Sequence, residues 1–527
     1  MSSTEALTAR YGPAYRWMAT GTALIASFSV ILSATIVNVA VPEIMGAFGI
    51  EQTKAQWLST GFLAAMTATM LLGDWAGRAF GQRRTITTAL ILFTVGSVLG
   101  GVAPDEDILI LARVLQGAAA GIVQPTAMMI LFDLFPPHER GSAMGIFGIG
   151  VVLAPALGPW VGGLLMDSFN WRYVFYLGVP FALLGIVLAN VLLPSRVETG
   201  PRASFDWAGF GLLAVFLVTI LNALSNGQRA GWDSDRILIQ FALAGICLVA
   251  FIVWEGRVAK PMLELRLFRN SRLAGAAMVS FVLGGGMFGT TYLLPVFVQT
   301  IQGLTPTEAG LLLMPAGLVM IVIFPLAGRL SDRMSPGILI GAGFILFAWS
   351  SYLTGGVDVS TGFWILAWWA IVGRIGMGFI FPALSVGSLR ALPPDLLAQG
   401  SGVVNFMRQL GGAFGVNLLV VMLERRTMFH ADAFAATQTP DNAATMAYLS
   451  HAANYTDAAG LSNLQQIPAA VWFLGQAVYL QANTLAYQDC FLITAVVAAA
   501  ALVPTWLLDR GTARTVHRPD SRIRLSQ

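Results

Sequence analysis

Charged side chains are scarce in this chain. Asp, Glu, Lys and Arg make up 11% of the 527 residues, against 56% hydrophobic residues, and the mean hydropathy is +0.72. Soluble globular chains carry about 25% charged residues. This deficit of charge excludes a soluble enzyme, a disordered protein and a nucleic-acid-binding protein.

Cysteine and histidine are also few. Cys247 and Cys490 both lie in apolar runs, so no disulfide framework is expected, and four scattered histidines give no metal-ligand spacing. The chain contains no G-x-x-x-x-G-K-[ST] string, which argues against ATP as the direct energy source. It also lacks the clusters of His, Asp or Ser near a membrane interface that would indicate a membrane enzyme.

Long apolar runs are abundant instead. A helix that crosses the hydrocarbon core of a bilayer needs about 20 mostly apolar residues. Fourteen such runs are present, at 17–41, 56–76, 85–104, 108–132, 141–165, 172–193, 206–225, 236–254, 273–298, 307–328, 336–354, 362–388, 398–423 and 485–508. We therefore predict an all-α membrane protein with fourteen spans, of which the first is an uncleaved anchor.

The basic residues predict the orientation of these spans. With the N-terminus inside, cytoplasmic segments hold 21 Lys and Arg residues and external loops hold six. The remaining three, Arg113, Arg374 and Arg408, fall within spans. The positive-inside rule places both termini in the cytoplasm. An odd number of spans would remove this excess of Lys and Arg on the cytoplasmic side.

Weak internal repetition divides the chain. The segment 73–84 follows the second span, and the similar Gly328–Arg333 segment follows the tenth. Related Arg-containing strings also occur in the fourth and twelfth spans. We predict two six-helix bundles around a central pathway, 1–195 and 273–527, separated by linkers and two inserted spans at 196–272. The basic stretch 256–272 is predicted to be an amphipathic surface helix.

The fifth span carries a string rich in glycine and proline. Pro155 and Pro159 remove backbone donors and bend the helix, while Gly158, Gly162 and Gly163 let another backbone approach closely. An ordinary kinked packing helix is the alternative interpretation, but the full G-P-x-x-G-G string is far more specific than a single pair of small residues.

These motifs resemble the major facilitator superfamily, specifically its fourteen-span drug:proton antiporter branch of the EmrB/QacA type. The resemblance covers about residues 17–508 and is carried also by 35–42, 109–121, 171–180 and 405–412. It implies the major facilitator fold and export of lipophilic compounds in exchange for protons. It also implies gating roles for Pro155, Gly158, Pro159, Gly162, Gly163, Gly328, Asp332, Arg333 and Arg374.

The sequence departs from the family pattern at an acidic position. The Asp that the family places two residues before Thr35 is Ser33 here, and the first loop motif has Gly77 or Arg78 where an Asp is expected. Because Ser33 cannot titrate, we expect proton coupling to use another acid. The candidates are Asp74, Asp133 and Asp489.

Arginines inside spans are functional candidates because a charge at the bilayer centre is costly. No Asp or Glu falls in the middle of a span. Either backbone carbonyls and helix-end acids satisfy the arginines, or a ligand such as a lipophilic weak acid does so by pairing with Arg113 and Arg408. The candidate substrate-binding residues are Asn38, Arg113, Gln116, Gln124, Asn405, Arg408 and Gln409, although each amide can equally link two helices.

The last external loop, 424–484, is unusually long. Thr439 is the expected N-cap of a helix at Ala443–Ala453, and 464–480 is expected to extend the last span outward. Two interpretations stay open: a self-packed cap over the outer mouth, or a docking surface for a periplasmic adaptor that leads to an outer-membrane channel.

The expected protein is a multi-pass transporter of the bacterial inner membrane. Its expected partners are a lipophilic small-molecule substrate and membrane lipid, with no nucleic acid. We expect no cofactor, only the proton gradient as energy source. The alternatives are a dedicated exporter of one metabolite or lipid, and a non-transporting membrane sensor or scaffold.

Overall fold

The computed structural model describes residues 3–135, 140–195, 204–258, 261–389, 397–458, 460 and 462–509. This part of the chain is helical and contains no strand. The first half comprises α1 (Ser3–Tyr11), η1 (Gly12–Ala14), α2 (Tyr15–Phe48), α3 (Gln52–Ala55), α4 (Trp57–Phe80), α5 (Gln82–Gly101), α6 (Glu106–Leu134), α7 (Arg140–Ser168), α8 (Arg172–Tyr176) and α9 (Gly178–Leu192).

Two inserted helices and a second bundle follow. The inserted pair is α10 (Trp207–Ala230) and α11 (Asp235–Glu255). After η2 (Leu265–Arg269), the second bundle comprises α12 (Ser271–Thr300), α13 (Pro306–Arg333), α14 (Pro336–Thr354), α15 (Phe363–Leu389), α16 (Leu397–Ala435), α17 (Ala443–Ala458), α18 (Asn463–Ala500) and α19 (Leu502–Asp509). The all-helical architecture predicted from the apolar runs is confirmed.

Every predicted span falls on a helix. Twelve helices within the described residues are long and apolar enough to cross a membrane. The other two predicted spans fall on α4 and α7, which contain side chains outside the described residues, among them Asp74 and those of 140–152. The count of fourteen therefore stays a prediction.

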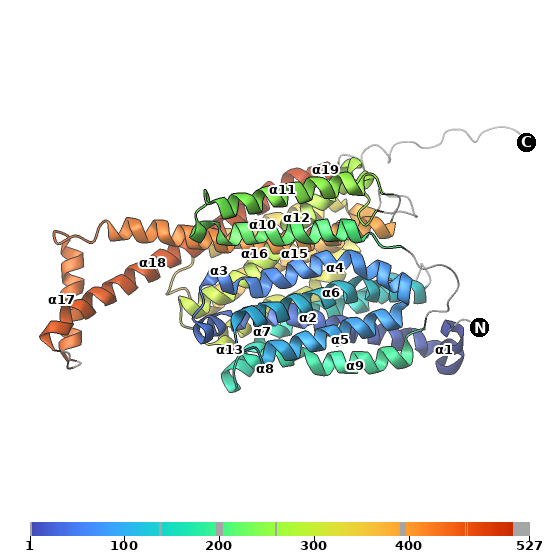
Figure 1. Cartoon of the computed structure of the whole chain (residues 1–527), viewed down its shortest axis with the longest axis horizontal. Coiled ribbons are helices and arrows are strands. Elements are labelled where there is room, and N and C mark those ends of the chain that lie inside the picture. The colour runs from blue at the N-terminus through green and yellow to red at the C-terminus, as the bar shows by residue number, and fades with distance from the viewer. Residues whose placement is uncertain are drawn as a thin grey trace, which may run out of the picture.

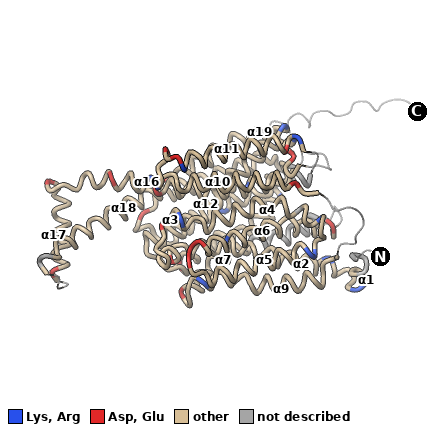
Figure 2. The backbone as a smooth tube through the Cα atoms, in the orientation of Figure 1, with Lys and Arg blue, Asp and Glu red and all other residues tan. Residues whose placement is uncertain are grey.

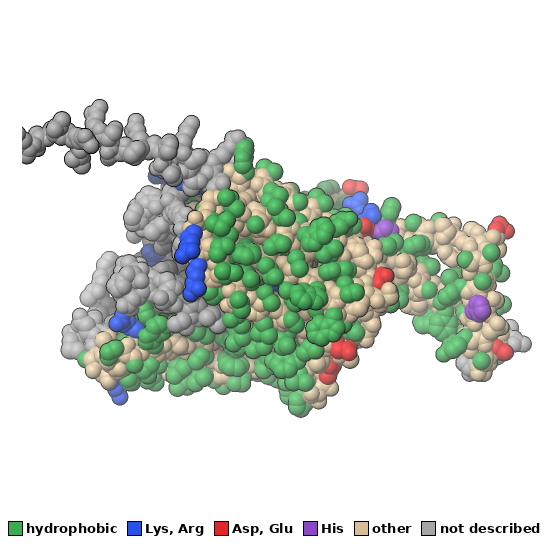
Figure 3. All heavy atoms as spheres, turned by 180° about the vertical axis from the view of Figure 1, so that it is seen from behind, with side chains coloured by type: hydrophobic (Ala, Val, Ile, Leu, Met, Phe, Trp, Pro, Cys, Tyr) green, Lys and Arg blue, Asp and Glu red, His purple; other side chains and the backbone are tan. Residues whose placement is uncertain are grey.

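The helices run roughly parallel along one long axis, which gives the molecule two distinct ends (Figure 1). We call the end near α1 the terminal end. The opposite end, from which α17 and the adjoining parts of α16 and α18 project, is the arm end. The flank between them is covered largely by hydrophobic side chains, as Figure 3 shows for one face. Such a surface is compatible with lipid, which does not need polar contacts.

Local signals explain where several helices begin. The Asp105 side chain accepts a hydrogen bond from the Ile108 N–H and caps α6. Thr305 and Glu308 form a reciprocal capping box at the start of α13, where Pro306 occupies the first turn. These caps fix the ends of helices whose interiors are too apolar to signal a boundary.

Two local predictions are wrong. The predicted surface helix at 256–272 is absent from the described residues there, which form turns and the short 3-10 helix η2. Pro261 lacks a backbone donor, and Asn270 already caps α12, so little length is left for a helix. In the arm, α17 begins at Ala443 as expected, but Asn442 is its N-cap in place of Thr439, because the Asn442 side chain accepts the N–H groups of Ala444 and Thr445.

The inserted pair lies against both bundles. Leu213, Leu217 and Phe251 belong to the same buried apolar cluster as Leu273 and Leu283 of α12. At the arm end, α10 instead makes polar contacts with the first bundle. The Ser225 hydroxyl accepts hydrogen bonds from Gln56 Nε2 (2.6 Å) and Trp57 Nε1 (3.2 Å). The pair therefore contacts each bundle through both kinds of group, since Asn417 of α16 also donates to the Leu221 carbonyl and Trp75 of α4 also packs against Trp207.

Candidate transport site

Arg113 of α6 is completely buried and bound by neutral groups. Its Nε donates to the Leu58 carbonyl (2.7 Å), and its Nη1 donates to the Ser33 carbonyl (3.1 Å), the Ser33 hydroxyl (3.0 Å) and Gln116 Oε1 (2.8 Å). Gln116 in turn donates to the Ser97 hydroxyl. The guanidinium also lies 4.3 Å from the centre of the Phe62 ring. The two carbonyl contacts match the alternative in which backbone carbonyls satisfy the buried arginines, and the Ser33 hydroxyl and the Gln116 side chain add acceptors that were not expected.

Arg408 of α16 has a different environment. It lines a small cavity together with Asn405, Phe381 and several serines. Its guanidinium carbon lies 4.3 Å from the centre of the Phe381 ring, and its buried Nε has no hydrogen-bond partner. Arg408 and Asn405 are therefore brought together, but α12, α15 and α16 surround them, and Arg113 does not line this cavity.

Arg374 of α15 belongs to a polar chain that joins the two bundles. Its Nη2 donates to the Thr291 hydroxyl (2.5 Å), and the Thr291 carbonyl accepts from Asn38 Nδ2 (3.5 Å). Asn38 Oδ1 accepts from the Ser59 hydroxyl (2.6 Å). Arg374 also lines a second small cavity in the second bundle. Asn38, a predicted substrate ligand, thus links α2, α4 and α12.

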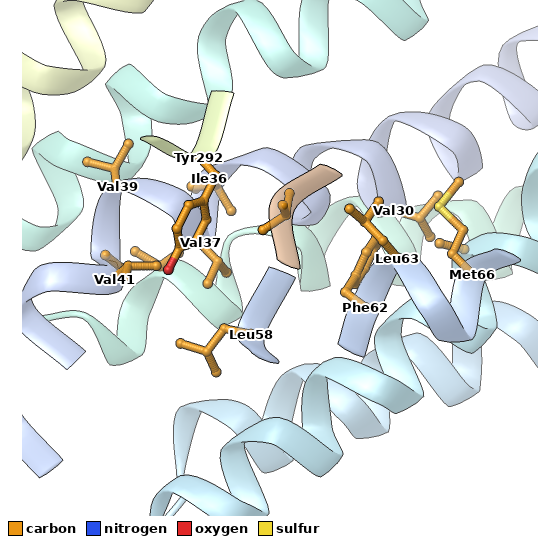
Figure 4. Packing of buried hydrophobic residues seen from close by; sticks show 14 of the residues in the cluster. Val30, Ile36, Val37, Val39, Val41, Leu58, Phe62, Leu63, Met66 and Tyr292 are labelled. Carbon is orange, nitrogen blue, oxygen red and sulfur yellow. The ribbon is translucent and has the colours of Figure 1, made fainter. Parts of the chain in front are cut away.

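Other contacts between the bundles lie near this chain. Tyr292 of α12 packs among Ile36, Val37 and Val41 of α2 (Figure 4). Among the described residues, the remaining hydrogen bonds between the bundles run from Gln52 to Tyr292, from Gln299 to the Val39 carbonyl and from the Thr307 N–H to Asp167. All of them lie toward the arm end, so the bundles are joined there.

The fifth predicted span, α7, crosses α13 at very close range. A methyl group on Gly163 would lie 2.2 Å from the Pro306 carbonyl oxygen, and one on Gly310 would lie 2.2 Å from the Pro159 carbonyl oxygen. Gly162 and Gly158 face Ile36 and Thr35 of α2 instead. Pro155 and Pro159 lie inside the same helix. Only glycine permits the two backbones to approach this closely.

Two of the predicted proton-coupling acids, Asp133 and Asp489, lie at different ends of the molecule. Gln82 donates to Asp133 at the exposed terminal end. Asp489 accepts from Arg426 (2.5 Å) and His430 (2.8 Å) where the arm leaves the bundle. The side chain of Asp74 lies outside the described residues.

The remaining predicted residues are placed as follows. Gln409 is buried with an unpartnered Oε1, and Gln124 is half-buried with an unpartnered Nε2. Arg333 is exposed at the end of α13, and space around Gly328 is open. The Asp332 side chain lies outside the described residues. Sequence reasoning missed Ser97, Ser59 and Thr291, because isolated hydroxyls in apolar runs carry no distinctive pattern.

The comparison with known families identifies this architecture. The Major Facilitator Superfamily model matches residues 23–416. The chain belongs to the major facilitator superfamily. It is therefore a membrane transporter, not an enzyme, and a multi-pass protein of the bacterial inner membrane.

Relatives and solved structures of the superfamily agree with this assignment. The chain is 33% identical to the multidrug transporter protein MdtP of Bacillus subtilis over 406 residues, covering 77% of this chain and 74% of the relative. It is 28% identical to the multidrug export protein EmrB of Escherichia coli over 488 residues, covering 92% and 93%. A bacterial homologue of the human lysosomal transporter Spinster, in an inward-facing and unoccupied conformation, has a similar fold, with a TM-score of 0.61, 17% identity and coverage of 95% and 98%.

Proposed function

We propose that this major facilitator protein exports lipophilic drugs or toxic compounds in exchange for protons. The observation that carries the proposal is the glycine-lined crossing of α7 and α13, which joins two bundles toward one end. A joint at one end of two bundles suits rocking about a central site, as alternating access requires. The named multidrug transporters among the relatives support the substrate class.

The orientation belongs to the same proposal. Basic residues gather at the terminal end of the bundle, whereas acidic residues are prominent at the arm end (Figure 2). By the positive-inside rule, the terminal end faces the cytoplasm, and both termini with it. The hydrogen bonds between the bundles then lie on the external side, which supports an inward-facing arrangement of the fourteen proposed spans.

Proton coupling is proposed to use Asp74, Asp133 or Asp489, since Ser33 cannot titrate. Each acid is replaced in turn by Asn, and proton release on addition of substrate is measured in de-energised vesicles. Loss of proton release in one variant identifies the acid. Retention of proton release in all three variants contradicts the assignment of coupling to these acids.

Drug export is tested by a susceptibility panel with and without the protein, repeated with an uncoupler. Resistance to several lipophilic compounds that disappears with the uncoupler is the expected result. No change for any compound would overturn the multidrug proposal, and resistance that survives the uncoupler would overturn the ion gradient as its energy source.

The arm is proposed to dock a periplasmic adaptor. It projects away from the bundle in Figure 1, which does not fit a cap over the end, and it exposes Tyr455, Ile467 and Trp472. Deletion of about residues 436–470 is expected to abolish resistance in intact cells while transport into inverted vesicles survives. Loss of both activities contradicts the docking role.

A further inference from the structure

The cavity beside Arg408 has the character of an anion site. We call it the Arg408 cavity; its lining comes from α12, α15 and α16 of the second bundle. Arg408 is the one charged residue among the described residues that line it, and none of these residues is a carboxylate that could neutralise the guanidinium. Uncompensated positive charge within a membrane protein is costly, so an anionic ligand would gain from occupying this position.

The Arg408 guanidinium has N–H donors without a hydrogen-bond acceptor. Within the described chain, no hydrogen bond or ion pair satisfies Arg408, whose defined contact is with the Phe381 ring. Arg113 differs in its surroundings, because four hydrogen bonds to neutral groups occupy its Nε and Nη1, and its unpartnered Nη2 lines neither of the two cavities described above. A guanidinium carries five N–H donors in a planar fork that suits a carboxylate or phosphate group. Arg408 therefore has donors available inside a cavity, where an oxyanion can reach them.

The rest of the lining defines the kind of anion. The hydroxyls of Ser280, Ser385 and Ser388 donate to backbone carbonyls of their own helices, so Asn405 and the Ser401 hydroxyl are the further donors beside Arg408. One cation favours a single negative charge. Leu283, Leu384 and Val404 add apolar surface beside these polar groups, which favours a ligand with an apolar tail.

We propose that the Arg408 cavity binds the head group of a lipophilic monoanion, with Arg408 as the bidentate donor and Asn405 as a second donor. A carboxylate or a phosphodiester on an apolar chain shares the required chemistry. As a substrate site, this inference rests on the proposed export function; as a binding site, it stands on the geometry alone. It also confines the predicted anion contact to the second bundle, without Arg113.

Direct binding tests the proposal separately from transport. The full-length protein is placed in phosphatidylcholine nanodiscs at about pH 8, where a carboxylic acid is ionised. Binding of dodecanoate is compared with that of the neutral dodecanamide for wild type, Arg408→Gln and Arg408→Lys. Arg269→Gln, which removes an exposed arginine outside the cavity, is the matched control. A second arm adds phosphatidylglycerol to the nanodiscs and detects bound lipid by native mass spectrometry.

We expect Arg408→Gln to weaken dodecanoate binding at least about tenfold, while dodecanamide binding and the Arg269→Gln control stay unchanged. Arg408→Lys keeps the charge but loses the planar fork, so it should fall between wild type and Arg408→Gln. Phosphatidylglycerol retained by wild type and lost in Arg408→Gln would identify a lipid head group as the source of the anion.

Several outcomes would overturn the site. Equal weakening of dodecanoate and dodecanamide would mean that the substitution perturbs the fold and not an anion contact. Absence of both dodecanoate and phosphatidylglycerol binding in wild type would also refute it. Binding that depends on Arg408, in a protein that exports no compound, would refute the export function and leave the site intact.

Discussion

A single methyl group at the crossing of α7 and α13 should disturb the conformational equilibrium of this transporter. In Gly163→Ala, the new Cβ would lie 2.2 Å from the Pro306 carbonyl oxygen. Real Cβ atoms essentially never come closer than 3.0 Å, so the helices must separate by about 1 Å. The reciprocal variant Gly310→Ala meets the Pro159 carbonyl oxygen at the same distance.

The magnitude follows from the cost of overpacking, which is about 1–3 kcal/mol. This penalty applies only when the arm end is closed, so it should shift the equilibrium between the two conformations by about 5-fold to 150-fold toward the state that is open there. Gly211→Ala in α10 is the control, because its Cβ would meet nothing within 4 Å. An alanine in a helix is otherwise slightly favourable, so backbone propensity cannot explain a loss.

Cross-linking across the same contact provides the assay. Asp167 Oδ2 accepts from the Thr307 N–H at 3.1 Å, so the pair Asp167→Cys and Thr307→Cys reports closure of the arm end. The two native cysteines are buried, which keeps background labelling low. We expect cross-linking by a short bis-thiol reagent and transport both to fall in Gly163→Ala and Gly310→Ala. Unchanged cross-linking in both variants would refute the reasoning.

Three further predictions concern polar contacts. Ser33→Asp places a carboxylate beside Arg113 Nη1, which lies 3.0 Å from the Ser33 hydroxyl in the present structure. The new ion pair should raise the melting temperature of the protein in detergent. A lower melting temperature would contradict the idea that the Arg113 charge is uncompensated. Ser225→Ala removes the hydroxyl that accepts from Gln56 Nε2, so it should lower the free energy of unfolding by about 1–3 kcal/mol. It should also reduce cross-linking at the arm end. Unaltered cross-linking would argue that Ser225 does not bridge α10 and the first bundle. Asp489→Asn weakens a partly exposed ion pair with Arg426, at a cost in stability of at most about 1 kcal/mol. Limited proteolysis should then cleave the arm faster than in the wild type. Equal cleavage rates would mean that this ion pair does not hold the arm in place.

The helices could be predicted from the sequence because one physical rule dominates in lipid. Backbone groups must be satisfied within the segment, so each long apolar run becomes a helix. The arm was also predictable in outline, since 464–480 continues the last span as part of α18. Helix boundaries in polar segments were less predictable, because several neighbouring residues can cap a helix and only the structure shows that Asn442 does so for α17.

The partners of the buried arginines could not be read from the sequence. Arg113, Arg374 and Arg408 share the same chemistry and similar apolar surroundings in the chain. The structure separates them: Arg113 is enclosed by Ser33, Gln116 and backbone carbonyls, whereas Arg408 lines a cavity. That difference arises from contacts between helices far apart in sequence, and periodicity along one helix carries no information about them.

The two faces of the inserted pair suggest how it moves. Its apolar contacts join the core of the second bundle, where no water can replace them without losing the burial of Leu213, Leu217 and Phe251. Its contacts with the first bundle at the arm end include the hydrogen bonds to Ser225 and the exposed Arg229–Glu51 ion pair, and water can replace these polar contacts when that end opens. Apolar packing is therefore the more costly contact to break. In alternating access, the pair is expected to move with the second bundle and to release Gln56 and Trp57 each time the arm end opens.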